Sequence, residues 1–348
     1  MKTLLPIITI IAFSISLVSC EESWLREEPT NNATEIFDIV WNDLDEHYSG
    51  FALQAKDWDS LYQVYRPKIT TQSSADELWV VLTEMLEELD DEHVKLFDED
   101  NERVFASGLD RVEEAQTEFD LELTASTYLE DIGAVNNYLL YGRIADTNIG
   151  YIYLAALLDE NPEVMAQALN ALSNIEADQA LVVDVRHCIG GYDGLAAQYA
   201  AYFSDGEHHL YNSQFRSGPA HQQLTEAVAY RSHAPVTQNF QAPVVLLTDA
   251  ITASEGEIFA LNLRSFSYVT HLGDTTAGAL SLVSPTRFLP NGWRYEYSIQ
   301  LITNPDGSSY EGQGIPPEHW VRNQAGDIAA GRDRVLEEAL NYLIAETK

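Results

Sequence analysis

Strand-like and helix-like segments alternate from about residue 149 onward, and this alternation limits the possible folds more than any other feature. Two continuous apolar runs, Ala180 to Val185 and Pro243 to Thr248, are typical of strands buried on both faces. Further strands are expected at 149–157 and 268–272, helices at 162–175, 194–204, from 254 and at 334–345, and a hairpin at 287–303 with its turn at Asn291-Gly292. This order predicts an α/β fold with a largely parallel sheet.

A helical region is expected before this part. Ile36, Val40, Leu44 and Tyr48 recur every four residues, and Ser74-Ala-Asp-Glu77 forms a capping box ahead of a second apolar stripe. We therefore predict a helical N-terminal region at 34–96, a mixed connecting segment at 97–146 and an α/β domain at 147–346.

The first twenty residues have the pattern of an export signal. Lys2 precedes an apolar stretch from Leu4 to Ser16, and Leu-Val-Ser-Cys20 closes the segment, which resembles the lipidation site of bacterial lipoproteins. We expect residues 1–20 to be a lipoprotein signal peptide, Cys20 to carry lipid, and 21–33 to form an acidic tether. The alternative is a plain signal peptide with an incidental cysteine. Localisation in the cell envelope, facing the periplasm and held in the outer membrane, follows from the first interpretation.

The charge of the chain excludes one class of partner. There are 19 Lys+Arg against 55 Asp+Glu, a net charge of 19 − 55 = −36. Such a surface repels phosphate backbones and anionic lipid head groups, so we expect no nucleic-acid partner, and membrane contact only through the lipid anchor.

Four positions could carry chemistry. Ser254 lies where a buried strand gives way to a helix, although Ser254-x-x-Glu257 is also an ordinary capping box. Gly190-Gly191 follows another buried strand, where uncovered amides could bind an oxyanion or simply form a tight connection. His93 and Glu311 have nothing in their local sequence that separates them from solvated surface residues.

Taken in order, these segments resemble the tail-specific (C-terminal processing) and tricorn-core serine peptidases. Leu89-Asp-Asp-Glu-His93 is similar to the family's Leu-Gly-Asp-Gly-His, and Thr252-Ala-Ser-Glu-Gly-Glu257 to its Thr-Ala-Ser-Ala-Ala-Glu. Further matches are the loop 183–191, Gly273 to Gly278, and Glu311-Gly-Gln-Gly-Ile-Pro-Pro. The resemblance covers roughly residues 35–320 and implies a ClpP/crotonase-like α/β catalytic domain.

The family has a Ser-Lys variant and a Ser-His-Glu variant. Ala279 stands where the lysine would be, and no lysine occurs between residues 96 and 347. The resemblance to the tricorn-like variant then implies Ser254 as nucleophile, His93 as general base and Glu311 as the residue that orients the imidazole, directly or through an intermediary. It also implies that the backbone N–H groups of Glu255 and of Gly190 or Gly191 bind the oxyanion, with no metal or other cofactor.

The sequence departs from the family in three places. Glu92 replaces the serine that precedes the histidine, so either two carboxylates share the relay or Glu311 acts alone. His187 and Cys188 stand in the glycine loop, where their side chains could reshape the oxyanion hole. Cys188 is also an alternative nucleophile, although the family pattern places no base beside it. Residues 97–145 lack a carboxylate-binding Gly-Leu-Gly signature, so no PDZ domain is expected.

The expected activity is serine-type endopeptidase action on peptides or unfolded proteins through an acyl-enzyme on Ser254. One alternative is a non-catalytic protein of the same fold that binds an apolar ligand, as retinoid-binding members do. The other is an esterase that uses the same nucleophile. The sequence leaves the oligomeric state and the cleavage specificity open.

Overall fold

A computed structural model describes residues 31–54, 56–109, 118–161, 163–234, 236 and 239–346. The expected signal peptide 1–20, Cys20, most of the tether 21–33 and Pro162 lie outside these residues, so these expectations stay predictions. The helices are α2 Ala33–His47, α3 Trp58–Tyr65, α4 Ala75–Glu87, α6 Leu121–Tyr128, α7 Val164–Asn174, α8 Leu195–Ala200, α9 Glu255–Arg264, α10 Ala325–Ala329 and α11 Arg334–Glu346.

The strands form three sheets. A seven-stranded sheet has the order β14 (His319–Trp320), β10 (Val269–Gly273), β9 (Val244–Thr248), β6 (Ala180–Asp184), β5 (Ile149–Leu154), β4 (Leu139–Ile144) and β3 (Leu129–Ala134). A four-stranded sheet has the order β11 (Arg287–Phe288), β12 (Arg294–Glu296), β1 (Lys95–Phe97) and β2 (Val104–Ala106). A three-stranded sheet has the order β13 (Gln300–Thr303), β7 (His209–Phe215) and β8 (Val228–Arg231).

The predicted α/β core is confirmed. Strands β5, β6, β9, β10 and β14 are parallel, and all residues of β5, β6 and β9 are buried, as their apolar runs predict. Helices α7, α8 and α9 share one hydrophobic core with one face of this sheet, and α11 and α6 pack on the other face. Strands β3 and β4 come from the segment 97–146 and extend the sheet in antiparallel orientation.

The N-terminal helices form a second body with its own core. Ser74 caps α4 in the predicted capping box, and the apolar faces of α2 and α4 pack together with Trp58 of α3. The hairpin β11–β12 turns at Gly292 as predicted, but it pairs with β1 and packs on this second body. The expectation that one hairpin runs to Thr303 is wrong, because β13 pairs with β7 in the three-stranded sheet.

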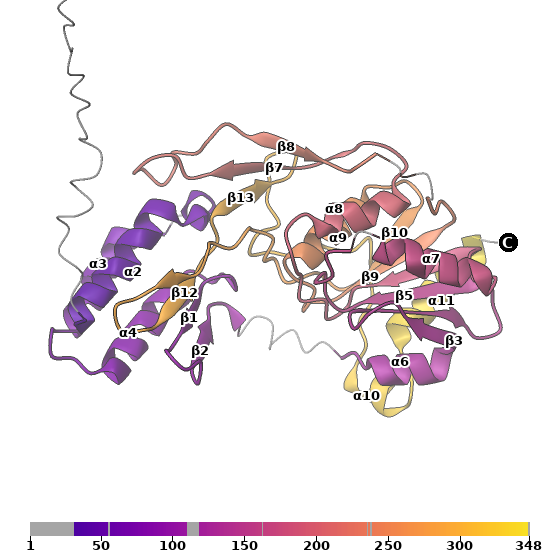
Figure 1. Cartoon of the computed structure of the whole chain (residues 1–348), viewed down its shortest axis with the longest axis horizontal. Coiled ribbons are helices and arrows are strands. Elements are labelled where there is room, and N and C mark those ends of the chain that lie inside the picture. The colour runs from indigo at the N-terminus through magenta and orange to yellow at the C-terminus, as the bar shows by residue number, and fades with distance from the viewer. Residues whose placement is uncertain are drawn as a thin grey trace, which may run out of the picture.

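The arrangement of the two bodies places the candidate site residues. In Figure 1, α2, α3 and α4 lie on one side, the large sheet with its helices lies on the other, and β7, β8 and β13 extend between them. Among the described helices, none combines the length and hydropathy needed to cross a bilayer.

Candidate active site

Ser254 lies at the N-cap of α9, in a strained backbone conformation. Its φ is +56° and its ψ is −127°, a region that residues other than glycine rarely adopt. Its N–H donates to the Ala279 carbonyl at 2.9 Å and to the Glu257 carboxylate at 3.2 Å, while the N–H of Ala253 donates to the Cys188 carbonyl at 2.9 Å. These hydrogen bonds hold Ser254 in its strained conformation. Strained backbone that is held in this way is typical of functional sites.

The glycine loop approaches this turn closely. Gly190 has a φ of +90°, and a Cβ atom there would lie 2.6 Å from the Ser254 Cβ and 3.0 Å from the Glu255 nitrogen. The loop is held from its other side by Leu157, whose N–H donates to the Gly190 carbonyl and whose carbonyl accepts from Tyr192. The structure therefore brings the predicted glycine loop, Ser254 and the Glu255 amide together, and only glycine fits at position 190.

The amides of this loop differ in their partners. The Gly190 N–H hydrogen bonds to the Cys188 thiol, which lowers the pKa of that group against the larger effect of burial. The N–H groups of Gly191 and Glu255 donate no hydrogen bond to any residue that the structure describes. These two donors are therefore available to a ligand, and they come from the two segments that the sequence singled out.

The two unusual loop side chains turn to partners of their own. The His187 ring Nε2 lies 3.3 Å from an Asp249 oxygen, and the ring stands edge-on to Phe119. Cys188 is fully buried, and burial raises the pKa of its thiol to about 12. The thiolate is the reactive form of cysteine, so this burial argues against Cys188 as a nucleophile.

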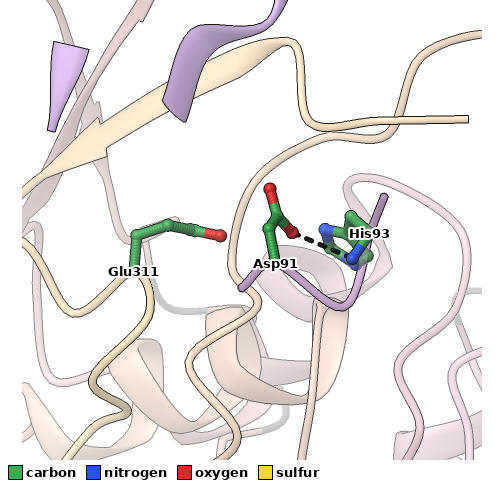
Figure 2. A group of neighbouring side chains, drawn as sticks. All are labelled: Asp91, His93 and Glu311. Atoms are coloured by element: carbon green, nitrogen blue, oxygen red, sulfur yellow. Dashed lines mark hydrogen bonds between the residues drawn. The ribbon is translucent and has the colours of Figure 1, made fainter. Parts of the chain in front are cut away.

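His93 and Glu311 lie in one cluster with Asp91. Oxygens of both carboxylates and a ring nitrogen of His93 all lie within 4.8 Å of one another. Figure 2 shows Asp91 between Glu311 and His93, with the hydrogen bond from the His93 backbone N–H to the Asp91 Oδ1, at 2.9 Å. The Asp91 Oδ2 accepts from the buried Tyr48 hydroxyl at 3.0 Å.

Asp91 is the member that the sequence reasoning missed. The sequence allows either that Glu92 shares the relay or that Glu311 acts alone, whereas in the structure the charge of Glu92 acts on Glu257. Asp91 could have been found from two signals. It occupies the aspartate position of the Leu-Gly-Asp-Gly-His element, and an aspartate two residues before another commonly accepts that residue's N–H.

Burial sets the protonation of this cluster. Burial lowers the pKa of His93, opposed by the charge of Asp91, so the imidazole is neutral at neutral pH. Burial raises the pKa of Glu311 well above its usual value, and the charges of Asp91 and Glu257 add to that shift. The Glu311 carboxylate nevertheless accepts two backbone bonds, from Leu280 at 3.1 Å and Ser281 at 3.0 Å.

One short segment connects Glu311 with Ser254. Ala279 accepts the Ser254 N–H, and the next two residues donate to Glu311. Glu257 fixes the same segment, because its carboxylate accepts from Gly278 at 2.9 Å and Ala279 at 2.8 Å. Within the described residues, no hydrogen bond joins the Ser254 hydroxyl to the His93 ring.

Comparison with known proteins agrees with this architecture. Residues 148–321 match the family model described as peptidase family S41, and residues 29–87 match the tricorn protease C1 domain. Carboxy-terminal processing protease CtpA of Bacillus subtilis is 24% identical over 190 residues, which are 55% of this chain and 38% of that protein. CtpB of the same organism is 25% identical over 175 residues, 50% of this chain and 34% of the relative. This chain thus spans little more than a third of the length of either relative.

The solved structures include a match over almost the whole chain. The crystal structure of a presumed peptidase from Parabacteroides merdae superimposes with a TM-score of 0.81 at 25% identity. The match covers 90% of this chain and 97% of that one. The similarity therefore includes the N-terminal body and not the α/β core only.

Proposed function

This chain belongs to peptidase family S41, and from that premise we propose that it is a serine endopeptidase that forms its acyl-enzyme on Ser254. The observation that carries the proposal is the close approach of the Gly190 loop to Ser254, beside two amides that bond to none of the described residues. That arrangement can place the carbon of a substrate carbonyl next to the Ser254 hydroxyl while the carbonyl oxygen accepts from the two amides.

The proposed cycle uses the neutral His93 imidazole. The Ser254 Oγ attacks the peptide carbonyl while its proton passes to a ring nitrogen of His93, and the same proton then moves to the leaving amine as the C–N bond breaks. Water repeats the sequence on the acyl ester and restores the serine. Catalytic hydrogen bonds of this kind commonly tighten only when substrate binds, so the hydrogen bond between Ser254 and His93 is expected in the substrate complex.

The amides of Glu255 and Gly191 are the proposed oxyanion donors. The Gly190 N–H is occupied by the Cys188 thiol, which favours Gly191 as the second donor. Each such donor contributes about 3 kcal/mol of transition-state stabilisation in related hydrolytic sites. Asp91 accepts the His93 backbone N–H, and we propose that the nearby carboxylates of Asp91 and Glu311 stabilise the imidazolium that forms when His93 takes the proton.

A serine-reactive fluorophosphonate and a set of fluorogenic peptides test the proposal. Wild-type protein should be labelled once and should hydrolyse peptides, while Ser254→Ala should lose both. Ser74→Ala is the matched control, because Ser74 also begins a capping box but lies in the N-terminal body. Equal labelling of wild type and Ser254→Ala would overturn the mechanism, and preference for short esters over peptides would favour the esterase alternative.

We also propose that the chain is exported and anchored through lipid on Cys20. The support is the order of Lys2, the apolar stretch and Leu-Val-Ser-Cys20 in the sequence. Metabolic labelling with a radioactive fatty acid should mark the wild-type chain and not Cys20→Ala. Labelling that persists in the variant would contradict the anchor.

A further inference from the structure

The cluster of Asp91, His93 and Glu311 brings together three side chains that can each supply a metal-ligand atom. The His93 Nδ1 is buried and has no hydrogen-bond partner, although His93 is only 5% exposed. A nitrogen lone pair or N–H that loses water without gaining a partner is costly, and such groups are rare in folded proteins. The same residue offers a ring nitrogen within 4.8 Å of two carboxylate oxygens.

The two carboxylates also have no cationic side chain paired with them among the residues that the structure describes. The described residues form no ion pair between a lysine or arginine and either Asp91 or Glu311. Their partners are neutral donors, namely the Tyr48 hydroxyl and the backbone amides of His93, Leu280 and Ser281. Two neighbouring buried carboxylates repel each other unless a proton or a metal ion lies between them.

We propose that Asp91, His93 and Glu311 bind a divalent transition-metal ion, with zinc as the preferred ion, and that its binding turns the peptidase off. One imidazole nitrogen and two carboxylate oxygens are a donor set that zinc accepts, and three protein ligands leave a fourth position for water. Magnesium and calcium favour all-oxygen sites, so the imidazole selects against them.

The inhibition follows from the tautomer of His93. A neutral imidazole has one proton and one lone pair. When the Nδ1 lone pair binds the metal, the proton is on Nε2, and no lone pair is left to accept the proton of Ser254. The ion also draws both carboxylates into its coordination sphere, so they can no longer stabilise an imidazolium formed during catalysis. This second half of the inference rests on the proposed function, whereas metal binding itself does not.

Binding is tested in the inactive Ser254→Ala protein, first freed of metal with EDTA. Titration of zinc against a chromophoric chelator should show one tight site per chain, and cobalt(II) in its place should give the visible absorption bands of a four-coordinate nitrogen–oxygen site. Asp91→Asn and Glu311→Gln in the same background should each weaken zinc binding at least tenfold. Thermal melting of each variant establishes that it is folded.

The exposed pair of His208 and Asp205 provides the matched control. It joins an imidazole to a carboxylate at 2.6 Å, but within the described part of the chain it belongs to no group of three metal-ligating side chains. His208→Gln should leave the tight site unchanged. If this variant removes zinc binding while Asp91→Asn and Glu311→Gln retain it, the ion is adventitious and the inference is overturned.

Activity measurements separate this inference from the proposed function. Zinc should inhibit wild-type peptide hydrolysis at the concentration that fills the site, and EDTA should reverse the effect. If zinc binds tightly but the metal-free protein cleaves no peptide, the proposed peptidase activity is refuted and the proposed zinc site stands. If the protein cleaves peptides and zinc neither binds to it nor inhibits it, the proposed zinc site is refuted and the peptidase activity stands.

Discussion

At the scale of single residues, the position of the proposed nucleophile Ser254 depends on its close contact with Gly190. Nothing bulkier than hydrogen fits on the Gly190 α-carbon, since a Cβ would lie 2.6 Å from the Ser254 Cβ. The neighbouring loop is held by Leu157, so it cannot retreat without breaking two backbone hydrogen bonds. The site is therefore built by backbone approach as much as by side-chain chemistry.

Gly190→Ala should reduce kcat/KM by at least about 100-fold, the scale of losing an oxyanion donor. Both the clash with Ser254 and the φ of +90° oppose the alanine. Gly194→Ala separates these effects, because Gly194 has a similar φ of +83° with nothing within 4 Å of the added Cβ. If both variants lose activity equally, backbone strain alone accounts for the effect and the steric account is wrong.

Glu255 makes the stability depend on pH. Its carboxylate accepts from the Ala196 N–H at 2.9 Å, but burial, aided by the charge of Asp193, raises its pKa to about 7. The folded state then binds a proton more tightly than the unfolded state. The stability from this group is fully present below the unfolded pKa, and it declines as the pH rises through the folded pKa near 7.

We expect Glu255→Gln to flatten this part of the profile. From pH 5 to pH 8, wild type should lose about 3 kcal/mol of unfolding free energy that the variant does not lose. Urea unfolding across this range measures the difference between the two proteins. Glu226→Gln, at an exposed position, should follow wild type, and parallel profiles for wild type and Glu255→Gln would contradict the argument.

The sequence identifies individual site residues only where the local pattern and the family motif point to the same position. Ser254 and the Gly190-Gly191 pair stand at the ends of buried strands, where local pattern and family motif agree. Asp91 is one of three consecutive acids, 90–92, before His93, and composition cannot tell which of them faces the imidazole. The backbone of this loop decides, because the His93 N–H binds the Asp91 carboxylate.

At the scale of elements, a buried charge cluster attaches α11 to the large sheet. Arg186 follows β6 and is 1% exposed, and its guanidinium bonds to Asp184 and to Asp333, which precedes α11. Burial alone would raise the pKa of Asp333, but the charge and hydrogen bonds of Arg186 overcome it and hold that pKa below its usual value. The cluster thus fixes the helix that covers one face of the sheet.

Arg186→Met should destabilise the protein by about 3–5 kcal/mol, because it leaves two buried carboxylates without a cation. Urea unfolding at neutral pH measures this loss. The exposed pair of Arg332 and Glu337 gives the comparison, and Arg332→Met should cost about 1 kcal/mol or less. A small effect of Arg186→Met would mean that the carboxylates take up protons at little cost.

The same contrast between buried and exposed elements explains which parts of the fold were predictable. The central strands β6 and β9 are continuous apolar runs, because both of their faces are covered. All four residues of β8 are exposed, so its sequence has no burial pattern to read. The sequence of strand β13 resembles the end of a hairpin, but its pairing with β7 joins residues that are 85 to 91 positions apart in the chain, from 300 − 215 to 303 − 212.

At the scale of the whole molecule, the candidate site draws on both bodies. His93 and Asp91 follow α4 of the N-terminal body, whereas Ser254 and Glu311 belong to the α/β part. Hydrogen bonds between residues far apart in the sequence join the two parts, among them those of Ser49 to Ser298 and of Arg216 to Tyr48. Local sequence patterns carry no information about such contacts, and within the sequence only the family resemblance associates these residues.

Arg216 makes one of these cross-contacts. It follows β7, and its guanidinium donates to the Tyr48 carbonyl at 3.2 Å and to the Asp45 carbonyl at 3.0 Å. These carbonyls lie at the C-terminal end of α2, where a positive charge is favoured. Tyr48 in turn donates to Asp91, so Arg216 connects the three-stranded sheet to the loop of the proposed base.

Arg216→Met should therefore lower kcat/KM about tenfold while reducing the unfolding free energy by only about 1–2 kcal/mol. The Tyr48 and Asp45 carbonyls lose their donor, the end of α2 frays, and the Asp91 loop loses its fixed position. Amide hydrogen exchange should accelerate at residues 45–49 and 89–94 and stay unchanged in β6 and β9. Arg231→Met, at an exposed position of β8, should leave activity and exchange as in wild type. Faster exchange in the central strands would show instead that Arg216 supports the whole fold, and unchanged kcat/KM would show that this connection does not position the base.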